Sequence, residues 1–132
     1  MQLRHVAVLD DSLEFQYLVQ AMFDYLGITK IELWSHSAEA LPELIGVPPQ
    51  LLVLDVMMSG IDGIAVWRKL RQEKRTRTMP IIICTAAINR ILDQETFLQQ
   101  DPYTVLLTKP FTLDELKTAM QKLIPQWQPN EK

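Results

Sequence analysis

Charged residues stand directly after apolar runs at three places in this 132-residue chain. Asp10 and Asp11 follow the run 6–9, Asp55 follows 51–54, and Lys109 comes shortly after 103–107. If these runs are parallel strands of one sheet, their charged side chains meet at the same edge. Three carboxylates packed together repel one another and raise their own pKa values unless a counter-charge is present. Mg²⁺ is the expected counter-ion, because it prefers a few carboxylate oxygens and keeps several waters.

Phosphoryl transfer is the chemistry that such a cluster favours. A carboxylate beside Mg²⁺ and the ammonium of Lys109 can attack phosphorus, because both cations offset the charge of the transferring group. Thr85 follows a further apolar run, 81–84, and brings a hydroxyl to the same edge.

The elements that must position these residues alternate along the chain. Strand patterns occupy 6–9, 31–34, 51–54, 81–84 and 103–107, and helical patterns occupy 12–26, 37–45, 64–73, 88–99 and a final helix opening at Thr112. This alternation predicts an α/β fold, a parallel sheet covered by helices on both faces. In a flavodoxin-like, doubly wound sheet of order 2-1-3-4-5 with five helices, strands one and three lie side by side where the order reverses. Ligands bind at that point.

The first helix has a recognisable apolar face and end. Leu18, Met22 and Leu26 recur at helical spacing and predict the face that packs on the sheet. Gly27 follows as the residue that ends the helix.

Local signals also mark the later elements. Thr112 and Glu115 form a capping box at the start of the final helix. Pro42 sits awkwardly inside the second helix. We expect the domain to span 1–124 and the short tail 125–132 to be irregular.

Composition excludes several classes of protein. Apolar residues make up 48% and charged residues 22%, as in soluble globular domains. A net charge of −3 gives no basic face for nucleic acid, and no apolar stretch approaches the roughly 20 residues that span a bilayer. The single cysteine, Cys84, cannot form an internal disulfide, and the early acidic residues do not suit a signal peptide. We therefore expect a cytoplasmic protein that binds neither nucleic acid nor membranes.

Four motifs, each at the end of a predicted strand, resemble those of the receiver domains of two-component response regulators. They are VLDD at 8–11, LDVMMSGIDG at 54–63, TA at 85–86 and TKPF at 108–111. Each motif alone is weak, but together and in order they are very specific. The resemblance runs from about Arg4 to Ile124 and is closest to the single-domain, chemotaxis-type form.

The resemblance implies a role for each residue of the phosphoryl site. Asp55 would be the phosphoacceptor. Thr85 would hydrogen-bond one phosphoryl oxygen, and Lys109 would pair with another. Pro110 would follow a cis peptide bond, which X-Pro bonds tolerate.

The resemblance also implies a set of Mg²⁺ ligands. Asp11 and Asp55 would bind the ion, and Asp10 would act mainly through water. The backbone carbonyl of Met57 would complete the protein ligands.

Several positions depart from the family pattern. Leu106 stands three residues before the lysine, where a switching Tyr or Phe is usual, and Tyr103 lies three residues further back. Ser59 replaces a usual proline, and 100–102 replaces the usual Gly-Ala before strand five. Leu106 therefore predicts a weakened coupling between Thr85 and the fifth strand.

Structural roles compete with these functional ones. Asp10 and Asp11 would also suit the start of a helix. The aromatic residues Phe15, Tyr17 and Tyr25 fall off the predicted core face of the first helix. They are either a docking patch for a partner or ordinary scattered surface aromatics. A basic cluster is most simply a solvated helix face; it comprises Arg68, Lys69, Arg71, Lys74, Arg75 and Arg77.

The leading function is a signalling module that is not a turnover enzyme. The resemblance implies a histidine kinase or phosphotransfer domain as phosphoryl source and a downstream protein as output partner, and it leaves the oligomeric state open. An aspartyl-phosphate phosphatase would need a second Asp where Met57 stands. A binding-only pseudo-receiver is disfavoured by the acids and Lys109, and a flavin-binding protein by the acidic first loop.

Overall fold

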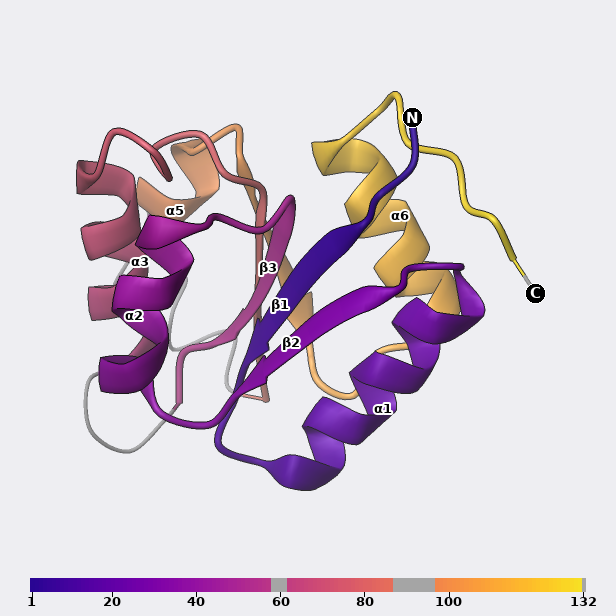
Figure 1. Ribbon diagram of the computed structural model, residues 1–132, viewed down its shortest axis with the longest axis horizontal. Helices are drawn as coiled ribbons and strands as arrows, with labels where there is room; N and C mark the ends of the chain where they lie inside the picture. The colour runs from indigo at the N-terminus through magenta and orange to yellow at the C-terminus, as the bar shows by residue number, and fades with distance from the viewer. Residues whose placement is uncertain (58–61, 87–96, 132) are drawn as a thin grey trace.

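The computed structural model describes residues 1–57, 62–86 and 97–131, which form a single layered α/β unit (Figure 1). Its strands are β1 (His5–Leu9), β2 (Lys30–Trp34), β3 (Leu51–Asp55), β4 (Ile81–Thr85) and β5 (Thr104–Thr108). Its described helices are α1 (Leu13–Tyr25), α2 (Ser37–Gly46), α3 (Gly63–Gln72), α5 (Phe97–Gln100) and α6 (Leu113–Leu123). All strand pairs are parallel, and the order is β2-β1-β3-β4-β5, as predicted.

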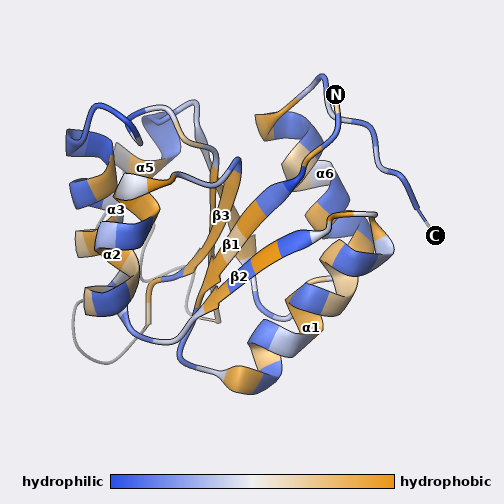
Figure 2. Ribbon diagram, viewed as in Figure 1, coloured by the Kyte–Doolittle hydropathy of each residue, from blue (hydrophilic) through white to orange (hydrophobic). Residues whose placement is uncertain are grey.

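Two hydrophobic cores lie on opposite faces of the sheet. Helices α1 and α6 cover one face, and α2, α3 and α5 cover the other. Alternate residues of each central strand enter opposite cores, so that Val6 and Val8 pack under α1 while Ala7 and Leu9 face α2. Burial on both faces explains why the central strands read as continuous apolar runs, and Figure 2 shows the hydrophobic colour along most of β1 and β3.

The predicted core face of α1 is right at Leu26, which is buried, and at Met22, which packs partly buried against the core, but it is wrong at Leu18, which is 47% exposed. Val19 and Phe23 are the fully buried residues in the middle of the helix. The third buried position of this face is Gln16, a polar residue. The buried stripe at 16, 19 and 23 begins with this polar residue. The stripe at 18, 22 and 26 is apolar throughout, so it is the one that the sequence pattern favours.

Helix ends follow local chemistry. The Ser12 hydroxyl accepts from the Phe15 N–H at the start of α1, and the predicted capping box between Thr112 and Glu115 is present at α6. Gly27 follows α1 with a φ of 84°, a conformation that favours glycine.

Most of the fourth predicted helix lies outside the described residues, and the fifth strand starts later than expected. Of the predicted helix 88–99, residues 97–99 are described, and they belong to α5 (Phe97–Gln100). Strand β5 begins at Thr104 rather than Tyr103, because the Tyr103 N–H donates to Asp101 Oδ1 at 2.9 Å and stays in the preceding turn.

The tail after α6 is irregular, as expected, but it is packed rather than loose. Trp127 is 2% exposed and belongs to the core under α1 and α6. The Asn130 N–H donates to the Leu26 carbonyl at 3.3 Å. A Cβ at Gly27 would come within 2.5 Å of the Asn130 carbonyl oxygen, so the tail needs glycine there.

Among residues 1–57, 62–86 and 97–131, no helix is both long enough and apolar enough to cross a membrane.

Candidate functional site

Three acidic residues meet at the carboxyl edge of the sheet. Asp10 and Asp11 follow β1, and Asp55 ends the neighbouring β3, where Leu9 pairs with Leu54. Carboxylate oxygens of the three residues lie within 4.8 Å of one another. Asp10 and Asp55 are buried, and Asp11 is exposed. This set of hard oxygen donors, open on one side, fits a Mg²⁺ ion that retains several waters.

Both carboxylate oxygens of Asp10 have partners within the protein. Oδ1 accepts from the Ser12 N–H at 2.8 Å, and Oδ2 accepts from Lys109 Nζ at 2.5 Å. A metal ion could bind Asp10 directly only through the lone pairs that these two donors leave. The exposed Asp11 is therefore the better placed of the two for direct coordination.

Asp55 lies at the end of a fully buried strand. Its Oδ1 accepts from the Met57 N–H at 3.1 Å, and its Oδ2 lies 3.4 Å from Lys109 Nζ. Burial raises the pKa of Asp55, and the neighbouring charge of Asp10 adds to the rise; the Met57 N–H and Lys109 offset them only in part. The ionised carboxylate is thus short of positive charge, which a bound cation would supply.

Lys109 follows β5, the edge strand two places from β3, and its side chain extends to the acids. Its backbone N–H donates to the Thr85 carbonyl at 3.0 Å, which ties the end of β5 to the end of β4. The peptide bond to Pro110 is cis, as predicted. Burial by itself would lower the pKa of Lys109, but the hydrogen bond to Asp10 and the surrounding negative charge outweigh it and raise the pKa.

Thr85 and Met57 are the two remaining residues of the predicted site. Thr85 is the last residue of β4, is 1% exposed, and pairs with Thr108, so it lies at the same edge as the acids. Met57 is 56% exposed, so its side chain does not fill space in the core, the role that a methionine would ordinarily suggest. Its carbonyl as a metal ligand stays a prediction, as do the individual roles of the other five residues.

Sequence reasoning missed the role of Gln16. Its side-chain amide donates to the Asp10 carbonyl at 2.6 Å and the Trp34 carbonyl at 2.9 Å, and it lies 3.0 Å from the Ser35 hydroxyl. It thereby ties the ends of β1 and β2 to α1 directly behind the acids. A polar residue at a buried helical position, 16 before 19 and 23, is the signal that could have found it.

Phe15 also departs from its predicted place, because it is not an exposed aromatic. Its ring is partly buried, packs against the first core, and lies under the ammonium of Lys109, with Nζ 3.9 Å from the ring centroid. Tyr17 and Tyr25 are exposed at 60% and 43%, as predicted.

The departures from the family pattern have distinct surroundings. Leu106 pairs with Ile83 and packs, partly buried, against the second core. Tyr103 is 41% exposed and lies outside the strand, so it does not replace the missing aromatic there. Ser59 lies outside the described residues.

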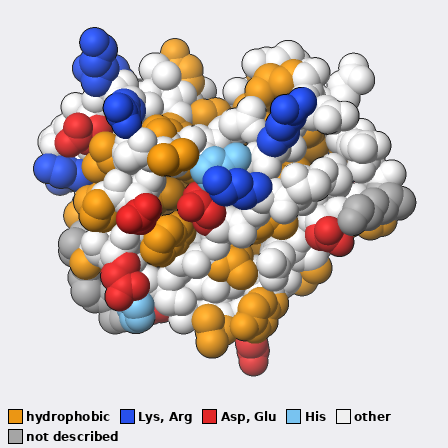
Figure 3. All heavy atoms as spheres, in the orientation of Figure 1, with side chains coloured by type: hydrophobic (Ala, Val, Ile, Leu, Met, Phe, Trp, Pro, Cys, Tyr) orange, Lys and Arg blue, Asp and Glu red, His pale blue; other side chains and the backbone are white. Residues whose placement is uncertain are grey.

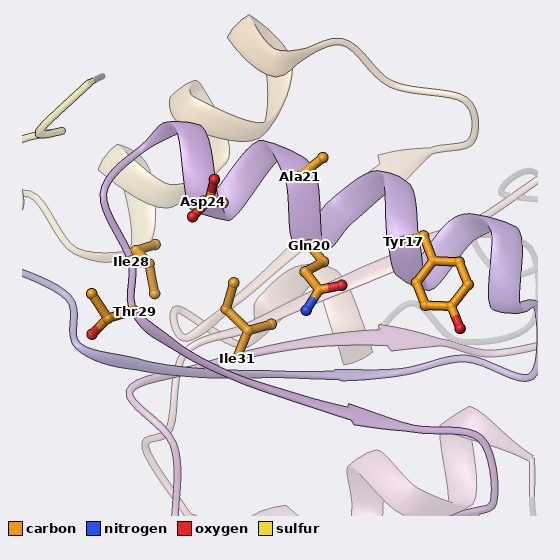
Figure 4. A pocket seen from close by; sticks show the side chains of 7 residues that line it. All are labelled: Tyr17, Gln20, Ala21, Asp24, Ile28, Thr29 and Ile31. Atoms are coloured by element: carbon orange, nitrogen blue, oxygen red, sulfur yellow. The ribbon is translucent and has the colours of Figure 1, made fainter.

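A groove between α1 and β2 is separate from the acidic edge. It has a volume of about 360 Å³ and is lined by Tyr17, Gln20 and Asp24 of the helix and by Ile28, Thr29 and Ile31 beside it (Figure 4). Exposed apolar side chains also gather over the start of α1, where Leu13, Tyr17 and Leu18 are 47–60% exposed (Figure 3).

Part of the predicted basic cluster serves the fold. Arg71 lies over the Trp67 ring and pairs with Asp101 at 2.7 Å, and Arg75 donates to the Gly46 carbonyl at 2.8 Å. Cys84 is buried, as predicted, and burial raises the pKa of its thiol.

The chain is similar in sequence to known proteins. The chain is 30% identical over 124 residues to the response regulator Rre1 of Synechocystis sp., an alignment covering 92% of the chain and 52% of Rre1. It is 30% identical over 128 residues to the DNA-binding transcriptional regulator NtrC of Escherichia coli, covering 97% of the chain and 26% of NtrC. The chain thus spans about half or less of these relatives.

Solved structures share the fold. The chemotaxis protein CheY4 of Vibrio cholerae superposes with a TM-score of 0.80 at 22% identity, covering 92% of this chain and 99% of CheY4. The receiver domain of the sensor histidine kinase PA1611 of Pseudomonas aeruginosa gives a TM-score of 0.77 at 24% identity, covering 93% and 99%. The family model of the response regulator receiver domain matches residues 6–121. This chain therefore belongs to the response regulator receiver domain family, a family of signalling domains in two-component systems.

Proposed function

We propose that the chain accepts a phosphoryl group on Asp55 in a Mg²⁺-dependent reaction and signals through a changed protein-binding surface. One observation carries the proposal: Asp10, Asp11, Asp55 and Lys109 converge where β1 and β3 lie side by side. That point is the reversal in strand order, at which doubly wound sheets bind ligands.

In the proposed reaction an oxygen of Asp55 forms a bond to phosphorus while the bond from phosphorus to the donor's leaving group breaks. The products are an aspartyl phosphate and the released leaving group. Lys109 is 3.4 Å from Asp55 Oδ2 and can offset the negative charge on the transferring group. Thr85 is at the same edge, and its hydroxyl can donate to a phosphoryl oxygen.

Mg²⁺ fits the three acids and, when bound, would neutralise charge on the transferring phosphoryl group. Asp11 and Asp55 are the proposed direct ligands, with Asp10 acting through water and the Met57 carbonyl completing the set. The receiver domain of PA1611, at 24% identity, has a magnesium ion coordinated in its active-site cleft. The deficit of positive charge around Asp55 supports the same assignment here.

The proposed phosphoryl source is a histidine kinase or phosphotransfer protein. The exposed residues at the start of α1, Leu13, Tyr17 and Leu18, lie beside the acidic edge and form an apolar surface on which such a partner can dock. A downstream protein would read the changed surface. A cytoplasmic location stays a prediction.

We propose that the domain assists its own phosphorylation and slow dephosphorylation without being a turnover enzyme. Rapid hydrolysis by the aspartyl-phosphate phosphatase mechanism would require an acid or base two residues after the nucleophile. That position is Met57, an exposed thioether that cannot transfer a proton.

Intact-mass measurement tests the proposal. Incubation with acetyl phosphate and Mg²⁺ should add one phosphoryl mass to the chain, and Asp55→Asn should abolish the adduct. Asp62→Asn is a matched control, since Asp62 caps α3 through the Ala65 N–H and lies outside the acid cluster. Persistence of the full adduct in Asp55→Asn would refute the assignment of Asp55.

A further inference from the structure

The ammonium of Lys109 has an aromatic neighbour besides its acidic partners. Nζ lies 3.9 Å from the centroid of the Phe15 ring, well inside the roughly 6 Å within which a cation over a ring face is attracted. The same nitrogen donates to Asp10 at 2.5 Å and lies 3.4 Å from Asp55. Two carboxylates and one ring face together fix the place of this charge.

The Phe15 ring is itself held in place. Its backbone N–H donates to the Ser12 hydroxyl in the first turn of α1. Its ring meets Phe111 edge to face, with centroids 5.7 Å apart and planes at 84°. Phe111 is 5% exposed and lies two residues after Lys109, so the ring and the ammonium that it contacts are braced by the same segment.

The face of a fixed aromatic ring can hold the lysine ammonium in the site while the ammonium changes its carboxylate partner. Lysine loses more rotamer freedom on ordering than most side chains. A phosphoryl group at Asp55 would draw the ammonium away from Asp10, and the ring would keep it within the site during that shift. The attraction works on the whole charge and tolerates a small change of position, unlike a hydrogen bond.

We propose that Phe15 is a positioning residue for Lys109, whose ring face holds the ammonium ready for a phosphoryl group at Asp55. The inference rests on the proposed function, because the phosphoryl group is the partner for which Lys109 is held. The competing explanation is that Phe15 only fills the core under α1, in which case any ring of the same shape serves equally well.

Fluorination separates the two explanations. Replacing Phe15 in the full chain with 3,4,5-trifluorophenylalanine nearly keeps its shape but removes the negative ring face. With Mg²⁺ saturating, we expect the affinity for beryllofluoride, a phosphoryl mimic, to fall roughly threefold to tenfold. The same replacement at Phe23, fully buried two turns along α1 in the same core, should leave the affinity unchanged. Equal losses at both positions, no loss at Phe15, or tighter binding would each overturn the proposal.

A second measurement is independent of phosphoryl binding. In the metal-free protein, the Phe15 ring should shift the ε-methylene protons of Lys109 upfield, and Phe15→Leu should remove that shift. If the shift is absent from the unmodified protein, the inference fails whatever the protein's function. If the shift is present but Mg²⁺ and beryllofluoride do not bind the unmodified protein, the proposed function fails while the contact between Phe15 and Lys109 stands.

Discussion

Strand β5 has a cluster of charged residues at each end, and the two clusters differ in the ratio of cations to carboxylates. Before the strand, the Arg71 guanidinium donates to Asp101 Oδ2 at 2.7 Å, to the Thr76 and Tyr103 carbonyls at 3.0 Å, and to the Thr104 hydroxyl at 3.1 Å. One cation thus meets one carboxylate, with neutral acceptors around them. After the strand, the single ammonium of Lys109 shares its site with three carboxylates.

The pKa values of Asp101 in the first cluster and of Asp55 in the second are shifted in opposite directions. Burial would raise the pKa of Asp101, but the Tyr103 N–H, Arg71 and Thr104 outweigh it, and the pKa is lowered. Burial and the charge of Asp10 raise the pKa of Asp55 in spite of its donors. The balanced cluster stabilises the fold as it stands. The second, unbalanced cluster places three carboxylates beside the ammonium of Lys109, and perturbed groups of this kind are typical of sites that bind a ligand.

Breaking the balanced cluster should have the largest effect on stability. Arg71→Met leaves Asp101 partly buried without its cation, and we expect the free energy of unfolding to fall by about 3 kcal/mol. Urea denaturation measures the loss. Arg75→Met is the matched control, since that exposed arginine donates to one carbonyl and its loss should cost about 0.5 kcal/mol. Phosphoryl uptake by the folded Arg71→Met protein should be unchanged, and a large fall would contradict a purely structural role.

Within the unbalanced cluster, the two adjacent acids should differ. Mg²⁺ affinity should be weak in the unmodified protein, and Asp11→Ala should lower it tenfold or more, about 1.4 kcal/mol. Asp10→Ala should lower it less, because the Asp10 carboxylate is already bound to Ser12 and Lys109. Titration followed by amide chemical shifts gives both affinities. The reverse order would show that Asp10 is the direct ligand.

The raised pKa of Asp55 predicts a pH-dependent gain in stability when the charge is removed. Between the usual value of 3.8 and the raised value, the folded protein holds more protons than the unfolded one. The free energy of unfolding therefore falls as pH rises through this window. Without metal at pH 7, Asp55→Asn should be more stable than the unmodified protein by about 1 kcal/mol.

That gain should shrink as the pH falls from the raised pKa of Asp55 toward 3.8, and it should be gone below 3.8, where Asp55 is protonated in both states. Saturating Mg²⁺ should cancel or reverse it at pH 7, because the ion stabilises only the carboxylate. Thermal denaturation at several pH values follows the difference. A variant that is less stable at pH 7 without metal would mean that Asp55 is already compensated.

The smallest effect concerns Leu106. A leucine fills space but cannot make the hydrogen bond of a buried tyrosine, worth about 0.5–1.5 kcal/mol. We therefore expect a modest response to beryllofluoride in the unmodified protein and a larger one in Leu106→Tyr, measured by amide chemical shifts. Leu107→Tyr, one residue along and on the opposite face of β5, is the control. A large, cooperative response in the unmodified protein, centred on Leu106, would contradict this prediction.

The sheet and the acidic edge could be predicted because the burial of each central strand shows in its own few residues. A strand covered on both faces must be apolar throughout, so its first charged residue marks the edge. The placement of Asp10 and Asp55 at this edge is therefore visible in the sequence itself, while Lys109 follows the partly buried edge strand β5. The strand order then brings them together.

Other features depend on residues distant in the chain and could not be predicted in this way. The burial of Phe15 depends on Lys109 and Phe111, almost a hundred residues later. Gln16 is buried because three acceptors from two strand ends surround its amide. The predicted start of β5 is one residue early because the Asp101 side chain competes with the sheet for the Tyr103 N–H.

The packed tail has a mechanical consequence. It crosses the amino edge of the sheet, where the Gln128 N–H donates to the Met1 carbonyl and the Asn130 N–H to the Leu26 carbonyl. A pulling force applied to residue 131 would first break the ion pair of Glu131 with Lys117 and these two hydrogen bonds, and would then extract Trp127 from the core. The acidic edge lies at the opposite ends of the strands, so the contacts that break first under such a force are the ones at the end of the sheet away from Asp55.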